Sequence, residues 1–185
     1  MNKFYDPNDA ANWLKKGKIL IHPTEGVWGI GCDAFNAAAV KKINSLKQRE
    51  ASKSLILLAS SISDALRYFQ PLSEQKIKFL ETVWPGHTTV IYNKNKLIPR
   101  YLNTVNNTIA LRVSNHKPIK DLLAIFNNLM VSTSANISNL PTPVNQEEVM
   151  KIFIDPDVAI YCFENGGSLK PSAIIDLNTM NYIRE

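Results

Sequence analysis

Apolar residues occur along the chain in short runs, and polar segments with glycine or proline separate them. Runs such as LILL and LMV lack polar–apolar alternation, as expected for strands covered on both faces of a sheet. Strands are predicted at 18–22, 24–34, 54–60, 88–93, 108–114, 129–133, 158–163 and 173–177. Helices are predicted at 7–16, 36–48, 63–69, 73–83, 117–127 and 145–152. The interleaving of the two predicts an α/β layered fold with helices packed on a sheet.

Boundary signals support several of these elements. Asp6 precedes Pro7 at the start of the first helix, and Gly17 follows two lysines at its end. Asn36 is predicted to cap the second helix. The segment 24–34 carries three glycines between apolar residues, which indicates an irregular strand where backbone and ligand approach closely.

Three cations stand just before a predicted buried strand in the segment 46–58, LKQREASKSLILL. They are Lys47, Arg49 and Lys53. A partly buried cation is costly unless an anion or acceptor compensates it. A polyphosphate would do so, because arginine binds it as a fork and lysine as a mobile point charge. The alternative is that these cations only complement the dipole at a helix end, and this segment alone does not decide.

Length and composition narrow the class of protein. A chain of 185 residues with 45% hydrophobic and 20% charged residues suits one domain with a large core. No apolar run approaches the roughly 18 residues of a membrane span, and the N-terminal segment lacks the apolar core of a signal peptide. Two cysteines, Cys32 and Cys162, predict a reducing, cytoplasmic location. A net charge of +5 favours an anionic partner but does not separate ATP from RNA.

Six motifs follow one another along nearly the whole chain. They are Pro23-Thr24-Glu25, Lys47 and Arg49 with Lys53, Trp84-Pro85-Gly86 with Thr89, Ala110-Leu111-Arg112, Ser132/Ser134/Asn136, and Pro171-Ser172 with Ile174 and Asp176. Each is weak by itself, but in this order and spacing they resemble the YrdC (TsaC) family, the threonylcarbamoyl-AMP synthases. The resemblance implies a twisted mixed β-sheet flanked by helices with a wide, positively charged cleft. It also implies a single synthase domain over 1–185, without the additional C-terminal domain of longer relatives.

The resemblance further implies a reaction. L-threonine, bicarbonate and ATP would give L-threonylcarbamoyladenylate and pyrophosphate, for threonylcarbamoyladenosine modification of tRNA next to the anticodon. ATP would be a substrate accompanied by Mg²⁺, with no metal held by the protein itself. Threonylcarbamoyl transferase machinery would take the labile product, and weak binding of tRNA or double-stranded RNA is left open.

The resemblance also assigns the site residues one by one. Lys47 and Arg49 would be catalytic and would bind ATP, together with Lys53, Thr108, Ser134, Asn136, Thr142 and Arg184. Thr24, Arg112, Thr133 and Ser172 would bind threonine.

Plainer roles remain open for several of them. Thr24 would only satisfy backbone groups in a turn. Arg112 would occupy a sheet edge with its guanidinium in water. The segment STSAN at 132–136 would be a turn held by bonds from its side chains to the backbone. Glu25 is expected to orient its turn rather than to act in acid–base chemistry.

The sequence contains none of the patterns of several other kinds of site. There is no P-loop, GVWGIG does not open a helix as a Rossmann fingerprint would, and the three histidines are scattered without ligand spacing. Three positions depart from the family pattern: Trp28 replaces Tyr or Phe, His87 replaces the usual Pro, and Ser114 stands where Pro often follows Arg-Val. Trp28 should keep an aromatic wall, whereas the other two put local loop geometry in doubt.

Two other functions compete with this one. An RNA-binding or ribosome-maturation factor would agree with the basic charge, but the chain lacks aromatic–basic interleaving and a GXXG clamp. A carbamoyl-transfer module of hydrogenase maturation is the other alternative, although such modules belong to much larger chains.

Overall fold

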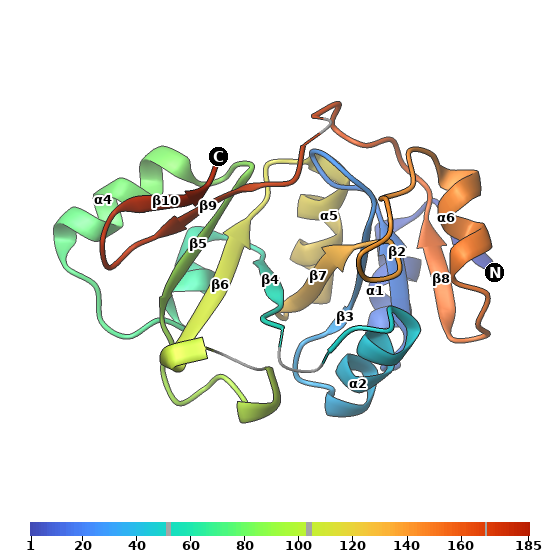
Figure 1. Cartoon of the computed structure of the whole chain (residues 1–185), viewed down its shortest axis with the longest axis horizontal. Helices are drawn as coiled ribbons and strands as arrows, with labels where there is room; N and C mark the ends of the chain where they lie inside the picture. The colour runs from blue at the N-terminus through green and yellow to red at the C-terminus, as the bar shows by residue number, and fades with distance from the viewer. Residues whose placement is uncertain (51–52, 103–104, 169) are drawn as a thin grey trace.

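A ten-stranded mixed β-sheet forms the centre of the computed structural model, which describes residues 1–50, 53–102, 105–168 and 170–185 (Figure 1). The strand order is β1-β8-β2-β3-β7-β4-β6-β5-β9-β10. The strands are β1 Asn2–Phe4, β2 Ile19–His22, β3 Gly29–Asp33, β4 Ile56–Ala59, β5 Thr88–Asn93, β6 Thr108–Val113, β7 Met130–Ser134, β8 Val158–Tyr161, β9 Ala173–Asp176 and β10 Asn181–Arg184. Ala51 and Ser52 of the basic segment lie outside the described residues.

The helices agree with the predicted positions, with some shifts at their ends. They are α1 Pro7–Lys15, α2 Ala37–Leu46, α3 Ile62–Leu66, α4 Glu74–Val83, α5 Lys117–Phe126 and α6 Gln146–Ile152, and short 3₁₀ turns lie at Arg100–Leu102 and Val105–Asn107. The two predicted caps are confirmed: Asp6 accepts a hydrogen bond from the Asn8 backbone N–H, and Asn36 accepts one from that of Ala39.

Two edge strands were missed by the periodicity. Strand β1 pairs in parallel with β8, and β10 pairs antiparallel with β9. Both are short and mostly exposed, so neither shows an apolar pattern. Strand β1 is formed by pairing with the distant β8, and β10 by pairing with β9, which directly precedes it in the chain. The predicted mixed sheet flanked by helices is confirmed.

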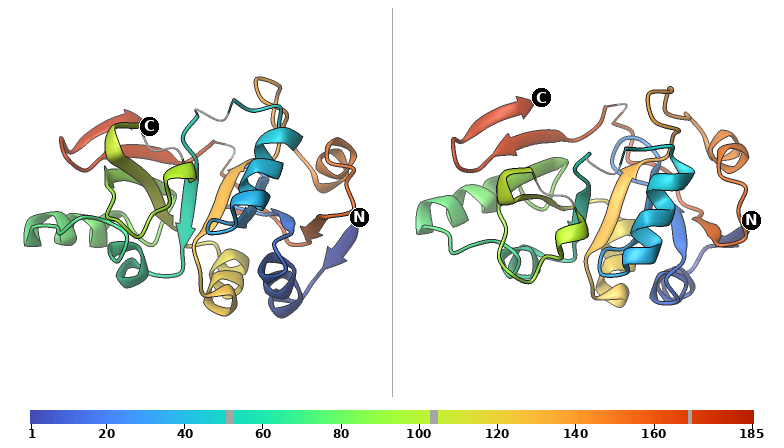
Figure 2. Two further views of the ribbon diagram at one scale, coloured as in Figure 1. Left: turned by 90° about the horizontal axis from the view of Figure 1, so that it is seen from below. Right: turned by 60° about the horizontal axis from the view of Figure 1, so that its bottom comes forward.

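Helices cover both faces of the sheet (Figure 2). Strand β4 shows the alternation: Leu58 packs in a cluster with residues of α1 and α5, whereas Leu57 packs in a cluster with residues of α2 and α6. The α1–α5 face is centred on Leu14, Leu122 and Met130, which are fully buried. In the described ranges, no helix has both the length and the apolar character needed to cross a membrane.

The strand register places a residue of the candidate site on the same face of the sheet as α1 and α5. Leu58 of β4 lies opposite Arg112 of β6 and opposite Met130 of β7. Directly paired residues share a face, so Arg112 points to the same side of the sheet as the core beneath α5. The paired residues Met130, Leu58 and Arg112 therefore lie on one face of the sheet, where two core residues are followed by a buried guanidinium.

Candidate active site

A cleft of about 330 Å³ brings together residues from the turn before β3, the segment before β4, and strands β5, β6, β7, β9 and β10. Seven of the predicted site residues line it: Thr24, Arg49, Arg112, Thr133, Ser134, Ser172 and Arg184. Trp28 also lines it and supplies the expected aromatic wall. The other five predicted residues, Lys47, Lys53, Thr108, Asn136 and Thr142, are not among the lining residues that the structure describes.

The hydroxyl of Thr24 organises the turn that precedes β3. It donates to the Val27 carbonyl oxygen at 2.7 Å and accepts from the Gly26 N–H at 3.0 Å. The Thr24 N–H donates to Asn165 Oδ1 at 3.0 Å, a partner that no sequence signal indicated. Thr24 therefore does satisfy backbone groups of this turn. The side chain also lines the cleft, and its hydroxyl oxygen can accept one more hydrogen bond.

Arg112 is buried inside the sheet, so the alternative that placed it at an edge in water is wrong. Only 5% of the residue is exposed, and Nη2 lies 3.3 Å from Glu25 Oε2. The other carboxylate oxygen of Glu25 accepts from Ser114 Oγ at 2.7 Å and from the Asn115 N–H at 3.0 Å. Arg112 Nε has no hydrogen-bond partner among the described residues. The side chain nevertheless lines the cleft, where the exposed part of its guanidinium can donate to a ligand.

Glu25 is held as an anion by these contacts. Burial raises the pKa of its carboxyl group. The charge of Arg112 and the hydrogen bonds from Ser114 and Asn115 lower this pKa by more than burial raises it, so the pKa is lowered overall. This arrangement agrees with the expectation that Glu25 orients its turn. It also shows that Ser114, a departure from the family pattern, holds a site carboxylate in place.

The three histidines are scattered in sequence but converge in space around Glu25 and Arg112. His22 is fully buried, and its pKa is lowered to about 4. Burial is the main cause and the charge of Arg112 adds to it, whereas the hydrogen bond between the ring and the Pro23 carbonyl acts to raise the pKa. Its ring fills the space over Gly29, where a Cβ would come within 2.4 Å of the ring, so glycine is required there. Among the described residues, no group of three or more His, Cys, Asp or Glu could hold a metal ion.

Lys47 holds the loop after β7 rather than lining the cleft. The residue is 1% exposed, and Nζ donates to the carbonyl oxygens of Ser134 and Asn136. The Lys47 carbonyl accepts from the Ser138 N–H at 2.8 Å. Burial, followed by the charge of Arg49, lowers the pKa of Lys47 to about 8, so the ammonium remains charged at neutral pH. Lys47 thus connects the end of α2 to the predicted nucleotide loop.

Arg49 is the cation of this segment that reaches the cleft. Its Nη2 donates to the Ser54 carbonyl at 2.8 Å, and its Nε is buried without a hydrogen-bond partner among the described residues. Burial lowers the pKa of its guanidinium, which nevertheless stays charged. Lys53 is exposed and does not line the cleft.

The remaining predicted residues divide between the cleft wall and its surroundings. Ser134 Oγ donates to Asn136 Oδ1 at 2.6 Å, which fixes the loop after β7. Ser172 Oγ lies 2.9 Å from Thr89 Oγ1, and the Ser172 carbonyl accepts two hydrogen bonds from the guanidinium of Arg184. Thr108 lies at the start of β6, where it lines a separate hollow of about 30 Å³, and Thr142 lies in the loop before α6.

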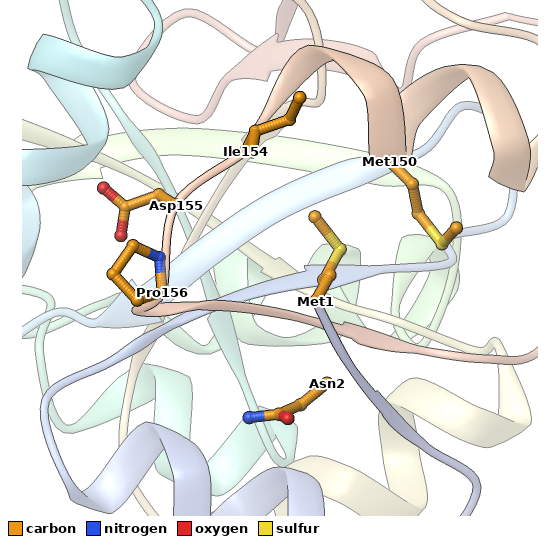
Figure 3. A pocket seen from close by; sticks show the side chains of 6 residues that line it. All are labelled: Met1, Asn2, Met150, Ile154, Asp155 and Pro156. Atoms are coloured by element: carbon orange, nitrogen blue, oxygen red, sulfur yellow. The ribbon is translucent and has the colours of Figure 1, made fainter.

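Another hollow, of about 460 Å³, lies between the N-terminus and α6 (Figure 3). Its lining is mostly apolar and includes Met1, Met150 and Ile154. The carboxylate there, Asp155, is paired with Lys42 at 2.8 Å. The described lining residues of this hollow include no cationic side chain and no hydroxyl, so the cleft is the better candidate for chemistry.

Comparison with known proteins agrees with the geometry. A family model described as telomere recombination (Sua5/yciO/yrdC) matches residues 12–185. A protein of Vibrio parahaemolyticus named threonylcarbamoyl-AMP synthase is 36% identical over 178 residues, which cover 95% of this chain and 96% of that protein. A protein of the same name from Buchnera aphidicola (subsp. Schizaphis graminum) is 38% identical over 189 residues, which cover 100% and 99%.

A solved structure shares the fold. The crystal structure of P. abyssi Sua5 complexed with L-threonine matches with a TM-score of 0.85 and 27% identity. The match covers 96% of this chain and 53% of that one, so the chain spans about half of the Sua5 length.

Proposed function

Because the chain belongs to the Sua5/yciO/yrdC family, we propose that it is a threonylcarbamoyl-AMP synthase that uses ATP as a nucleotidyltransferase. It joins L-threonine, bicarbonate and ATP into L-threonylcarbamoyladenylate and releases pyrophosphate. The product serves the threonylcarbamoyladenosine modification of tRNA. The proposal extends to a cytoplasmic location and to delivery of the product to a transferase.

The observation that carries this proposal is the composition of the cleft wall. Three guanidinium groups, those of Arg49, Arg112 and Arg184, line it together with serine and threonine hydroxyls, and no Asp or Glu is among its described lining residues. Such a wall suits reactants that each carry an anionic group, because fixed cations offset the repulsion between those groups and align them. Magnesium accompanies the nucleotide in this proposal, since the lining offers it no carboxylate.

The amino-acid side of the cleft is assigned to Arg112, Thr24, Thr133 and Ser172. The spare donors of Arg112 would bind the threonine carboxylate as a fork, with Glu25 keeping the guanidinium in place. Thr24 would accept a hydrogen bond from the substrate hydroxyl through its free lone pair.

The nucleotide side is assigned to Arg49 and Arg184 with Ser134, and beyond them to Asn136, Lys53, Thr108 and Thr142. Arg49 would bind phosphate oxygens with the part of its guanidinium that lines the cleft. Lys47 supports this side by holding the carbonyls of Ser134 and Asn136, and we retain its predicted contact with ATP as a proposal.

The reaction follows in two steps. The threonine amine adds to the carbon of bicarbonate, a C–O bond breaks, and water leaves to give a carbamate. A carbamate oxygen then attacks the α-phosphorus of ATP, and pyrophosphate leaves. The chain holds the phosphates and the carboxylate in line and needs no covalent nucleophile for this sequence.

Pyrophosphate release tests the proposal. Purified protein with ATP, bicarbonate and L-threonine should release pyrophosphate, and omission of threonine should abolish the release. The adenylate should appear in the same samples by mass spectrometry. Release that ignores threonine would overturn the assignment.

A further inference from the structure

His87 places an imidazole in the wall of the cleft on the amino-acid side. It lines the cleft together with Thr24 and Arg112. Its backbone position is fixed on both sides, because the Gly86 N–H donates to the Val113 carbonyl at 2.8 Å and the His87 carbonyl accepts from the Ala173 N–H at 3.1 Å.

The turn before β3 makes room for this ring. A Cβ at Gly26 would lie 3.1 Å from the Cε1 atom of His87, and still closer to the backbone oxygens of Lys170 and Ser168. Glycine at position 26 therefore lets the imidazole pack directly against the turn that Thr24 organises.

The proposed reaction requires a proton acceptor at this place. Threonine carries an ammonium group at neutral pH, and its nitrogen has no lone pair for attack until one proton has left. The guanidinium groups that line the cleft stay protonated, and the serine and threonine hydroxyls are not bases. Glu25 is not among the lining residues and is occupied by Ser114, Asn115 and Arg112. Of the described lining residues, His87 is the one that accepts a proton near neutral pH.

Burial, together with the positive charges that face it, keeps the ring of His87 neutral. Burial lowers its pKa most, the positive charges of Arg112 and Arg184 lower it further, and the carboxylate of Glu25 opposes them. The pKa is lowered overall from its ordinary value of 6.5, so the unprotonated ring predominates at pH 7.

We propose, on the basis of the proposed function, that His87 is the proton acceptor for the ammonium group of the amino-acid substrate in this chain. One N–H proton passes to the imidazole, and the freed lone pair attacks the carbon of bicarbonate. The N–C bond forms, the C–OH bond breaks, and the leaving hydroxide takes a second N–H proton and departs as water. The carbamate remains, and His87 returns its proton to solvent. Because the family usually has proline here, the assignment concerns this chain.

The test compares His87→Gln with wild type from pH 5.5 to 9.5. Pyrophosphate release at saturating ATP and fixed total bicarbonate gives kcat/KM for threonine at each pH. The ratio of variant to wild type removes the pH dependence of the substrates themselves. We expect a loss of about 10²-fold at pH 7, at the low end for a general base, that shrinks toward pH 9.5 as free threonine loses its proton in solution.

His116→Gln is the matched control, because His116 also lies near Glu25 and Arg112 but does not line the cleft. Its ratio should stay near one at every pH. A second variant, His87→Ala, should regain activity when imidazole is added, which covers the case of a poorly folded glutamine variant.

The outcomes separate the two proposals. A ratio for His87→Gln that stays at one, or a loss that is the same at every pH without imidazole rescue, would overturn the role of His87 alone. A wild-type protein without threonine-dependent release would overturn the proposed function together with it.

Discussion

Arg112 and Glu25 form an ion pair inside the cleft wall, with Nη2 3.3 Å from Oε2 and both side chains mostly buried. The pair joins strand β6 to the turn before β3. Glu25 is anchored independently by Ser114 and Asn115, so the carboxylate sets the orientation of the guanidinium. The carboxylate of Glu25 thus holds the residue that is proposed to bind a substrate carboxylate.

Replacing Arg112 with Gln should have two separable effects. The threonine requirement should rise steeply, because the carboxylate loses its bidentate partner, and stability should fall by about 3 kcal/mol because Glu25 becomes an unpaired buried charge. Calorimetric titration with threonine and urea unfolding measure the two effects.

The double variant Glu25→Gln/Arg112→Gln is the control for that change. It should recover much of the stability but none of the threonine affinity. Unchanged threonine binding in the single variant would place the carboxylate elsewhere.

Lys47 and Arg49 provide a contrast between two cations of one segment. Both alanine variants should lose about 2–4 kcal/mol of transition-state stabilisation in pyrophosphate release. The Lys47 variant should also lose about 1–3 kcal/mol of folding stability, because the carbonyls of Ser134 and Asn136 lose their donor. The Arg49 variant should lose less stability, because the Ser54 carbonyl that loses its donor there is exposed to water. Near-wild-type turnover in both would remove the phosphate assignment.

Thr24→Val should weaken the choice between threonine and valine more than it weakens ATP binding. The substitution removes an acceptor for the substrate hydroxyl, and burying an unpaired polar group costs about 1–3 kcal/mol. It also removes the bonds to Gly26 and Val27, so Thr24→Ser, which keeps the hydroxyl, is the matched control. The measurement is the ratio of kcat/KM for the two amino acids. A ratio unchanged in Thr24→Val would contradict the contact.

His22 should make the protein acid-sensitive. The unfolded chain protonates this imidazole below about 6.5, whereas the folded protein excludes the proton until about pH 4. Stability is therefore complete above pH 6.5 and falls as the pH drops toward 4, by at most about 1.4 kcal/mol per pH unit. Urea unfolding between pH 5 and 7 measures the slope, with carboxylate titration largely avoided.

Two variants identify which histidine makes the free energy of unfolding depend on pH. His22→Gln should remove most of this dependence between pH 5 and 7. His116→Gln should leave most of it in place, because the ring of His116 is only partly buried. An equal slope in wild type and His22→Gln would assign the acid sensitivity to other groups.

RNA should not be needed for synthesis. A chain of net charge +5 will bind tRNA weakly at low salt by releasing counterions, and this affinity should fall steeply with salt without preference for tRNA over an unrelated duplex. Product should form from threonine, bicarbonate and ATP alone. Filter binding across salt concentrations and synthesis with and without tRNA are the measurements. Selective, salt-resistant tRNA binding with tRNA-dependent synthesis would reverse this expectation.

Several local features of the chain could be predicted from its sequence. Asn36 caps α2 because its side chain bonds to an N–H three residues away, and the run 54–60 predicts the buried strand β4 from composition alone. For Arg112 the apolar strand left two possibilities, a buried guanidinium that needs a partner or an edge position in water. The cleft in which the motifs meet was expected from the family resemblance and not from the pattern of residues.

Partner choice was decided only by the tertiary structure. Lys47 and Arg49 stand two residues apart at the end of one helix, yet the first turns to the loop after β7 and the second to the cleft. His87 meets Gly26 although three strands lie between β3 and β5, because the segment before β9 bonds to both places: the Ala173 N–H donates to the His87 carbonyl, and the Ser168 N–H donates to the Glu25 carbonyl. Periodicity records which face of an element is apolar. It carries no record of which distant strand will be the neighbour, because that depends on the simultaneous packing of the whole sheet.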